Sequence, residues 1–338
     1  MLHNSLATYL ISFLFSYYTF FSTNTSPNNK LHLIEGKAQG TTYLIKYIHK
    51  DSVVSKSEID FIFSSIDSSL SLYKKYSTIS LFNSSSRGIK CTSHFYNVIQ
   101  QSIHFYNLTS GAFDITCKPL SNLWGFGSNT NIPPTPNIIN NTLINVGSNK
   151  IYFRKDSLIK EYEGVKIDCD GIAQGYTVDV IYSFLLNKGI SNFMVEIGGE
   201  VRSLGNNIKN EPWSIGIETA SNSVNNDFFV DKIVLISNKA ITTSGNYRKY
   251  KKLGNKYFSH IIDPIIGKPV DNGIISVSVI ADNAMTADAL DNALMVMGLE
   301  KSFKFAEYYK TIGFNITYVD KNGKISDTSN AVFKHYLK

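Results

Sequence analysis

The amino-acid sequence predicts an α+β fold with mixed or antiparallel sheets. Segments with a helical repeat and segments with strand composition occupy separate stretches: the chain is strand-rich from 213 to 278, and the longest predicted helix, 285–309, follows. A doubly wound parallel sheet would instead alternate strands and helices along the chain. The glycine-rich turn at 168–175 also matches neither the G-x-G-x-x-G fingerprint nor a Walker loop, which argues against a dinucleotide-binding or P-loop fold.

The first segment of the chain is apolar and uncharged. Residues 1–29 contain no Lys, Arg, Asp or Glu, and 6–21 is an almost unbroken apolar and aromatic run. Such a run directs a chain to a membrane, but it is short for a spanning helix and lacks the basic start of a standard signal peptide. We therefore expect a signal peptide or membrane anchor at 1–22, a polar linker at 23–30 and a folded domain at 31–338.

The first elements of the folded domain follow from periodicity and capping. Residues 31–48 alternate and are rich in Thr, Tyr and Ile, which predicts a strand with a bend at Gly36 and Gly40. Ser55 and Glu58 have the spacing of a capping box, and the apolar residues after them recur with a helical period, so a helix is expected there. A second helix is expected at 93–108.

The middle of the chain mixes loops, strands and one helix. Residues 128–149 are full of Asn, Pro and Thr, which indicates a surface excursion rather than a domain boundary. Hairpin-like strands are expected next, followed by a strand that ends at Asp168. Helical spacing covers 175–187, and a strand at 193–197 leads to the turn Gly198-Gly199.

The charge balance argues against nucleic acid as a partner. The formal net charge is +6, only 18% of the residues are charged, and no long Lys/Arg stripe with interleaved aromatic residues is present. A mildly basic enzyme that handles phosphates is the simpler interpretation. Cys91, Cys117 and Cys169 have no C-x-x-C spacing, so neither a zinc site nor a disulfide framework is indicated, and we expect reduced thiols.

Three oxygen-bearing side chains gather near the start of the longest predicted helix. The spacing of Asp288, Asp291 and Asn292 places them on one face of that helix. Carboxylate and amide oxygens suit Mg2+, which keeps few protein ligands and completes its octahedron with phosphate and water. This arrangement indicates a metal site for a phosphate substrate. The alternative is that the carboxylates only complement the dipole at the helix start.

Three further segments carry candidate chemistry. At 168–175 a helix begins after glycines, so backbone N–H groups can face an anion, and the carbonyl of Gly171 can approach a metal without a Cβ atom in the way. Segment 110–127 combines Asp114 with glycines and aromatic residues; it either holds a flat heterocycle or forms a core cluster under a loop. His260 is a candidate general base or phosphate partner, or else a structural histidine.

These pieces occur in an order that resembles the ApbE family, the FAD:protein FMN transferases. The resemblance covers 36 to about 300, nearly the whole predicted domain. It rests on these motifs: Gly40-Thr-Thr-Tyr43, Leu70-Ser-Leu-Tyr73, Ile79-Ser-Leu-Phe-Asn83, Gly111-Ala-Phe-Asp114, Asn122-Leu-Trp-Gly-Phe-Gly127, Asp168 to Asp179, Ile197-Gly-Gly-Glu200, Thr243-Ser-Gly-Asn-Tyr247, His260 to Pro264 and Ala287-Asp-Ala-Leu290.

The resemblance implies a single ApbE-like, T-fold-like domain that binds FAD as substrate, with Mg2+ bridging the pyrophosphate. Carried over by position, the family's FAD site falls on Gln39, Tyr73, Ala112, Phe113, Asp114, Asp168, Gln174, His260 and Ile262. Its metal ligands fall on the carbonyl of Gly171 and on Asp288, Asp291 and Asn292. The expected catalytic residues are Asp288, as principal metal ligand, and His260, as candidate base; a metal-linked carboxylate is the other candidate base.

The resemblance also implies an activity. FMN is expected to pass from FAD to a Thr or Ser hydroxyl of a partner protein, with release of AMP. The expected acceptor carries a short Thr/Ser motif and belongs to an exported or membrane-bound electron-transfer complex. Together with the apolar leader, this implies an exported protein on the periplasmic side of the cell inner membrane. Two alternatives stay open: an FAD pyrophosphatase, and an exported FAD-binding protein without turnover.

The chain departs from the family pattern at five positions. Gln39 stands where Met is common, Asp170 where Gly is usual, and Gln174 where Lys is usual. Asn292 stands at the position of a Thr metal ligand; Asn also offers an oxygen, so Mg2+ binding is expected to be retained but altered. Asn246 replaces an expected Asp, which leaves the role of its loop open.

Overall fold

The computed structural model describes residues 29–126, 132–220, 228–246, 250–253 and 256–338. The predicted leader at 1–22 and residues 23–28 of the predicted linker lie outside the described residues, as do Gly127 and Tyr247 of the motifs above. Among the described residues, no helix is both long enough and apolar enough to cross a bilayer. The division into leader, linker and domain stays a prediction.

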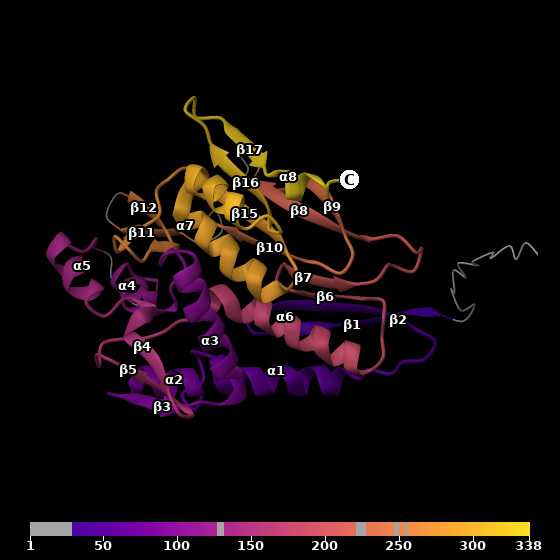
Figure 1. Cartoon of the computed structure of the whole chain (residues 1–338), viewed down its shortest axis with the longest axis horizontal. Coiled ribbons are helices and arrows are strands. Elements are labelled where there is room, and N and C mark those ends of the chain that lie inside the picture. The colour runs from indigo at the N-terminus through magenta and orange to yellow at the C-terminus, as the bar shows by residue number, and fades with distance from the viewer. Residues whose placement is uncertain (1–28, 127–131, 221–227, 247–249, 254–255) are drawn as a thin grey trace, which may run out of the picture.

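An eight-stranded sheet forms the centre of the domain (Figure 1). Its described strand pairs are all antiparallel, in agreement with the predicted fold class. In spatial order the strands are β1 (Lys30–Ala38), β2 (Thr41–His49), β6 (Phe193–Ile197), β7 (Glu200–Leu204), β10 (Ala240–Gly245), β15 (Ile274–Ala281), β16 (Gly313–Val319) and β17 (Ile325–Ser329).

Helices cover one face of this sheet. The four longest are α1 (Lys56–Leu70), α3 (Ser93–Leu108), α6 (Asp170–Asn187) and α7 (Ala284–Tyr308). Helices α6 and α7 lie side by side against the strands (Figure 1). Ile45 and Val195 of the sheet belong to the core on this face.

A hairpin covers the other face of the sheet. It consists of β8 (Trp213–Ala220) and β9 (Phe228–Ile236), with the short helix α8 (Ala331–Lys334) beside it. Met194 and Ile241 of the sheet pack here against Trp213 and Phe333. Because side chains alternate along a strand, each central strand contributes to both cores. The sheet is therefore a middle layer between the helices and the hairpin.

Smaller elements complete the domain. They are α2 (Thr78–Ser84), β3 (Gly88–Lys90), η1 (Ile115–Cys117), α4 (Lys118–Leu123), α5 (Pro136–Leu143), η2 (Ser148–Lys150), β4 (Ile151–Arg154), β5 (Ser157–Lys160), β11 (Tyr250–Leu253), β12 (Lys256–Ser259), β13 (Ile262–Asp263) and β14 (Lys268–Pro269). The three cysteines are free thiols, as the sequence predicted.

Several predicted elements are confirmed. Ser55 caps α1, and reciprocal bonds with Glu58 complete the capping box. Helix α3 and strand β6 have the predicted bounds. The predicted helix at 285–309 is α7, which bends at Gly298, where φ is 80°.

The single bent strand predicted at 31–48 is wrong. The segment forms β1 and β2, joined by a turn in which Gln39 and Gly40 have φ of 51° and 79°. Positive φ at both turn residues gives the backbone twist that suits a two-residue hairpin. Gly36, predicted as a break, lies inside β1, where a Cβ atom would be 2.8 Å from the hydroxyl oxygen of Tyr43.

The strand predicted to end at Asp168 is also wrong. Residues 165–169 lie outside every described strand. The backbone of Ile167 pairs instead with a side chain: its N–H donates to Asn83 Oδ1 at 2.7 Å, and its carbonyl accepts from Asn83 Nδ2 at 2.8 Å. The following helix begins at Asp170, before the predicted 175. The predicted surface excursion contains helix α5.

Candidate active site

The start of α6 packs closely against the start of α7. A Cβ atom on Gly175 would lie 2.8 Å from Asp288 Cβ and closer still to the carbonyl oxygen of Ala284. This approach lets the backbone N–H of Gly175 donate to Asp288 Oδ2 at 2.8 Å. Asp179 of α6 also accepts from the first backbone N–H groups of α7, those of Ala284 and Met285, at 2.9 Å each. The helix contact thus fixes the position of the Asp288 carboxylate.

Three carboxyl groups gather behind this contact. Asp288 and Asp291 are 4% and 1% exposed, and Glu200 Oε2 is buried without a hydrogen-bond partner among the described residues. Burial raises the pKa of Asp288 to about 7. Burial and the charge of Asp288 raise the pKa values of Asp291 and Glu200 well above their ordinary range. A cation bound here would favour the ionised carboxylates.

Asn292 connects these carboxylates to the start of α6. Its amide nitrogen donates to the carbonyl oxygen of Asp288 and to Asp291 Oδ1, both at 3.0 Å. A Cβ atom on Gly171 would lie 3.1 Å from the same nitrogen, so glycine allows the backbone to come close. Asp291 is directed toward the sheet, where the hydroxyl of Ser244 on β10 lowers its pKa.

The four predicted metal ligands fit Mg2+ by their chemistry. All of them offer oxygen: two carboxylates, one amide, and the backbone carbonyl of Gly171. Among the described residues, no group of three or more His, Cys, Asp and Glu side chains could hold a metal ion by itself. A Mg2+ ion at this position therefore needs further oxygen ligands from phosphate or water.

A cavity of about 310 Å3 opens beside Asn292 and Gly171. We call it the FAD cavity because most of the residues that the family resemblance predicts to bind FAD line it. Its volume lies in the usual range for small-molecule sites. It is formed by the starts of α6 and η1, the middle of α7, and the segment 260–264. Most of the predicted FAD-binding residues line it: Tyr73, Ala112, Phe113, Asp114, Asp168, His260 and Ile262.

Asp114 is the most strongly fixed of these residues. Its Oδ1 accepts from the backbone N–H of Thr116 at 2.8 Å, from the Thr116 hydroxyl at 2.7 Å and from the Ser148 hydroxyl at 2.7 Å. Burial raises the pKa of Asp114, while these hydrogen bonds lower it. The carboxylate is thus held in one orientation at the wall of the FAD cavity.

The polar wall of the FAD cavity includes a residue that the sequence analysis missed. Lys118 Nζ donates to Asp168 Oδ2 at 3.3 Å, and both side chains are mostly buried. Asp168 Oδ1 accepts from the backbone N–H of Asp170 at 3.1 Å, at the start of α6. Lys118 was not found because its only local feature is its place at the start of a short helix.

Aromatic side chains lie at the rim and floor of the same cavity. The ring of Tyr73 is 94% exposed, whereas Phe113 is 5% exposed and belongs to the core. His260 meets the ring of Phe126 edge-on, with 6.4 Å between the ring centroids. A cavity lined by an exposed aromatic ring and a buried one can accept a flat heterocycle.

Four predicted site residues do not line the FAD cavity: Gln39, Gln174, Asp288 and Asp291. The two aspartates are buried in the helix contact. Gln39 lies in the β1–β2 turn and donates to Asp67 Oδ1 at 3.2 Å. Gln174 of α6 donates to the carbonyl of Ile197 at 2.7 Å, next to the β6–β7 turn.

Comparison with known proteins agrees with this geometry. The model of the ApbE family matches residues 39–314. An FAD:protein FMN transferase of Vibrio cholerae is 36% identical over 319 residues, which cover 92% of this chain and 94% of the relative. One of Haemophilus influenzae is 34% identical, with 90% and 91% covered.

Solved structures give the same result. The flavin transferase ApbE from Vibrio cholerae has a TM-score of 0.81 at 34% identity, covering 91% of this chain and 100% of that chain. The flavinyl transferase ApbE of Pseudomonas stutzeri, in its apo form, has a TM-score of 0.81 at 29% identity, covering 91% and 97%. The chain therefore belongs to the ApbE family of transferases.

Proposed function

We propose that this protein transfers FMN from FAD to a Thr or Ser hydroxyl of a partner protein, depends on Mg2+, and releases AMP. The observation that carries the proposal is that the oxygen-ligand set of α6 and α7 adjoins the FAD cavity, with Gly171 and Asn292 belonging to both. The FAD:protein FMN transferases that resemble this chain do so over nearly their whole length, which supports the same activity.

Different parts of FAD would contact different parts of the cavity lining. Tyr73 and residues 112–114 would contact the flavin and its neighbourhood, and Asp168 with the segment 260–262 would contact the rest. Asp114 Oδ2, which accepts none of the three hydrogen bonds that Oδ1 receives from Thr116 and from the Ser148 hydroxyl, would accept from a ring N–H.

The reaction is a displacement at phosphorus. When bound, Mg2+ would neutralise charge on the pyrophosphate. Asp288, Asp291, Asn292 and the Gly171 carbonyl would hold it. The acceptor oxygen forms a bond to the FMN-side phosphorus, the bond from that phosphorus to the AMP oxygen breaks, and the hydroxyl proton passes to His260 or to a metal-linked carboxylate.

The acceptor and the cellular location are part of the same proposal. The acceptor would be a subunit of an exported or membrane-bound electron-transfer complex with a short Thr/Ser motif. The apolar segment at 6–21 supports export and placement on the periplasmic side of the cell inner membrane, whether the segment is cleaved or retained as an anchor.

The test is to incubate the purified protein with FAD, Mg2+ and an acceptor domain that carries the Thr/Ser motif, and to follow AMP release and the mass of the acceptor. The expected result is an FMN-sized mass gain that requires Mg2+ and is lost in Asp288→Ala. AMP and free FMN with an unmodified acceptor would indicate a pyrophosphatase. Tight FAD binding with no product at any Mg2+ concentration would indicate a binding protein.

A further inference from the structure

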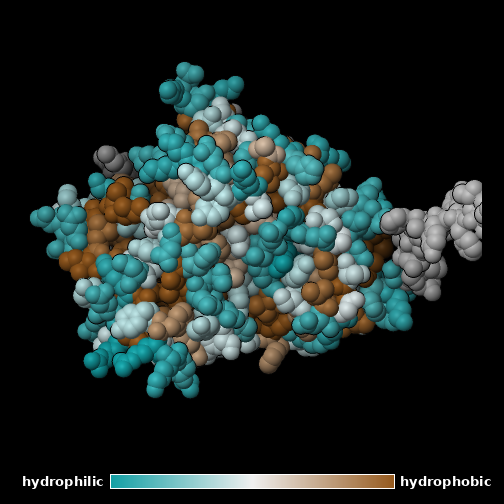
Figure 2. Space-filling view, in the orientation of Figure 1, coloured by the Kyte–Doolittle hydropathy of each residue, from teal (hydrophilic) through white to brown (hydrophobic). Residues whose placement is uncertain are grey.

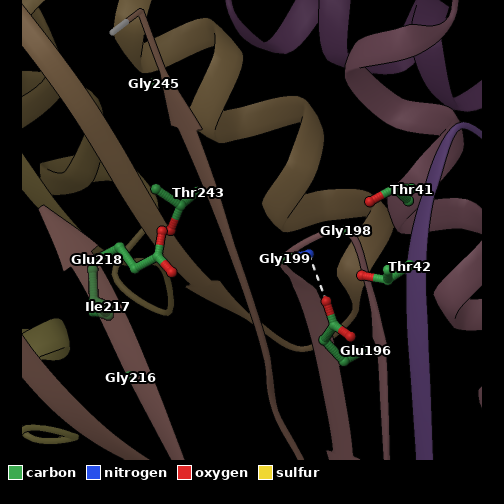
Figure 3. Close-up of a pocket in the computed structure, with 10 residues that line it drawn as sticks. All are labelled: Thr41, Thr42, Glu196, Gly198, Gly199, Gly216, Ile217, Glu218, Thr243 and Gly245. Carbon is green, nitrogen blue, oxygen red and sulfur yellow. Dashed lines mark hydrogen bonds between the residues drawn. The ribbon is translucent and has the colours of Figure 1, made fainter. Parts of the chain in front are cut away.

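A second cavity, of about 370 Å3, lies at the ends of the inner strands β2, β6 and β10 of the central sheet, beside β8 of the hairpin (Figure 3). Its lining residues are Thr41, Thr42, Glu196, Gly198, Gly199, Gly216, Ile217, Glu218, Thr243 and Gly245. None of these residues belongs to the FAD cavity or to the metal-ligand set above. We call this space the edge cavity.

The edge cavity exists because the β6–β7 hairpin is shorter than the strands on either side of it. On one side, β2 pairs with β6 from Tyr43, which lies opposite Ile197. Thr41 and Thr42 therefore extend to the level of the hairpin turn, where the N–H of Gly198 donates to the carbonyl of Thr42 at 3.0 Å. Because Gly198 and Gly199 have no side chains, the turn leaves space for the cavity.

On the other side, β10 extends past the same hairpin. Strand β7 pairs with β10 at Arg202 opposite Ala240 and at Val201 opposite Ile241. In the described part of the chain, no strand pairs with β10 beyond Ile241 on this side, although β10 continues to Gly245. The end of β10 thus presents an open strand edge to the cavity.

The edge cavity and the metal-ligand set lie on opposite sides of the β6–β7 turn. Ser244 of β10 faces Asp291, so its neighbour Thr243 points to the other face, into the edge cavity. Gln174 reaches the turn from α6, one helical turn after Gly171, and its amide occupies the space that a Cβ atom on Gly198 would need. The side chain of Gln174 thus connects the start of α6 to the turn that borders the edge cavity.

The lining of the edge cavity suits a peptide and disfavours a phosphate. Glu218 lies beside Thr243 on one side of the cavity, and Glu196 lies near Thr42 on the other (Figure 3). The lining contains two carboxylates and no Lys or Arg, so it should repel the pyrophosphate of FAD. Glycine-lined walls and an open strand edge instead allow another backbone to approach closely and pair.

We propose that the edge cavity binds an extended segment of the protein acceptor, which adds to the open edge of β10. This proposal rests on the proposed function. The segment is neutral or basic where it meets Glu196 and Glu218, and its reacting hydroxyl is directed over the Gly198-Gly199 turn toward the metal-ligand set. The acceptor and FAD would thus enter from opposite faces of the central sheet.

The first test fills the cavity. Thr42 is exposed and lies in a strand, so Thr42→Tyr retains strand propensity while it blocks the space. We expect the KM for an acceptor domain with the Thr motif to rise by at least about tenfold, with FAD affinity unchanged. The matched control is Ser214→Tyr, at an exposed position of β8 outside the lining, which should transfer FMN like the unchanged protein.

The second test reverses one charge. Glu218→Lys should weaken binding of the acceptor domain. The same variant should bind an acceptor whose threonine is flanked by glutamates about as well as the unchanged protein binds the original acceptor. The matched control is Glu211→Lys, an exposed residue just before β8 and outside the lining. Equal behaviour of Glu218→Lys and Glu211→Lys with both acceptors would overturn the proposal.

Failure of this inference differs from failure of the proposed function. Binding of an acceptor domain whose threonine is replaced by alanine is measured by calorimetry, without turnover. If that domain binds the unchanged protein and not Thr42→Tyr, the edge cavity is the docking site even when no FMN is transferred. If Thr42→Tyr lowers FAD affinity in parallel with transfer, or leaves acceptor binding unchanged, the edge cavity does not bind the acceptor.

Discussion

Asp114 is held by hydrogen bonds within the protein and is proposed to bind FAD, and two variants separate these roles. Its Oδ1 accepts three hydrogen bonds from Thr116 and Ser148. Asp114→Ala leaves those donors unpaired and should lower the free energy of unfolding by about 2–3 kcal/mol. Asp114→Asn keeps an acceptor oxygen, so it should unfold near the original temperature but bind FAD more weakly. Thermal denaturation and FAD titration check both; equal FAD affinity in Asp114→Asn would exclude the carboxylate from FAD binding.

Asn292 is the proposed metal ligand that departs from the family pattern. Asn292→Leu has a similar volume but no oxygen, and it should lower the apparent Mg2+ affinity of AMP release by about 10–100-fold. Asn292→Thr restores an oxygen and should recover most of that affinity. A Mg2+ titration of each variant measures the change. If Asn292→Leu keeps the original Mg2+ dependence, Asn292 only positions Asp288 and Asp291 through its amide hydrogen bonds.

Two glycines, Gly175 and Gly171, allow α6 to approach α7 closely, and replacing each by alanine should have a different effect. A Cβ atom on Gly175 would meet the backbone of Ala284, which cannot move independently, so Gly175→Ala should destabilise the protein by about 1–3 kcal/mol or more. The three atoms nearest to a Cβ atom on Gly171 all belong to the side chain of Asn292, which can move. Gly171→Ala should therefore fold nearly as stably but need more Mg2+. Denaturant unfolding and Mg2+ titration of both variants measure these effects. A large loss of stability in Gly171→Ala together with an altered Mg2+ requirement in Gly175→Ala would contradict the prediction.

The stability of the whole protein should depend on pH and Mg2+ through its buried carboxylates. The folded state raises the pKa of Asp288 from 3.8 to about 7, and it raises those of Asp291 and Glu200 as well. Between pH 3.8 and about pH 7, Asp288 is more protonated in the folded protein than in the unfolded chain, so the free energy of unfolding falls as pH rises. For Asp288 the fall is at most about 4 kcal/mol.

Mg2+ should remove this pH dependence, because it stabilises the ionised carboxylates in the folded state. Thermal unfolding from acidic to slightly alkaline pH, with Mg2+ and with a chelator, measures the effect. Asp288→Asn in chelator should show a flatter profile than the unchanged protein. A pH profile that is identical with and without Mg2+ would show that the ion does not bind at these carboxylates.

Local features of this protein were predictable from the sequence because they depend on backbone hydrogen bonds within one element. The capping box of α1 and the bounds of α3 and β6 are of this kind. The grouping of Asp288, Asp291 and Asn292 near the start of α7 also follows from helix geometry alone. Resemblance to a family supplied the remaining site residues, most of which the structure brings to one cavity.

Only the tertiary structure decided the features that join distant parts of the chain. The pairing of Asn83 with the backbone of Ile167, the ion pair of Lys118 with Asp168 and the burial of Glu200 beside Asp288 have no local pattern. The edge cavity depends on how far β2 and β10 extend past the β6–β7 turn. Strand register and helix contact distance set these arrangements, and both result from packing the whole domain rather than from the residues of any single segment.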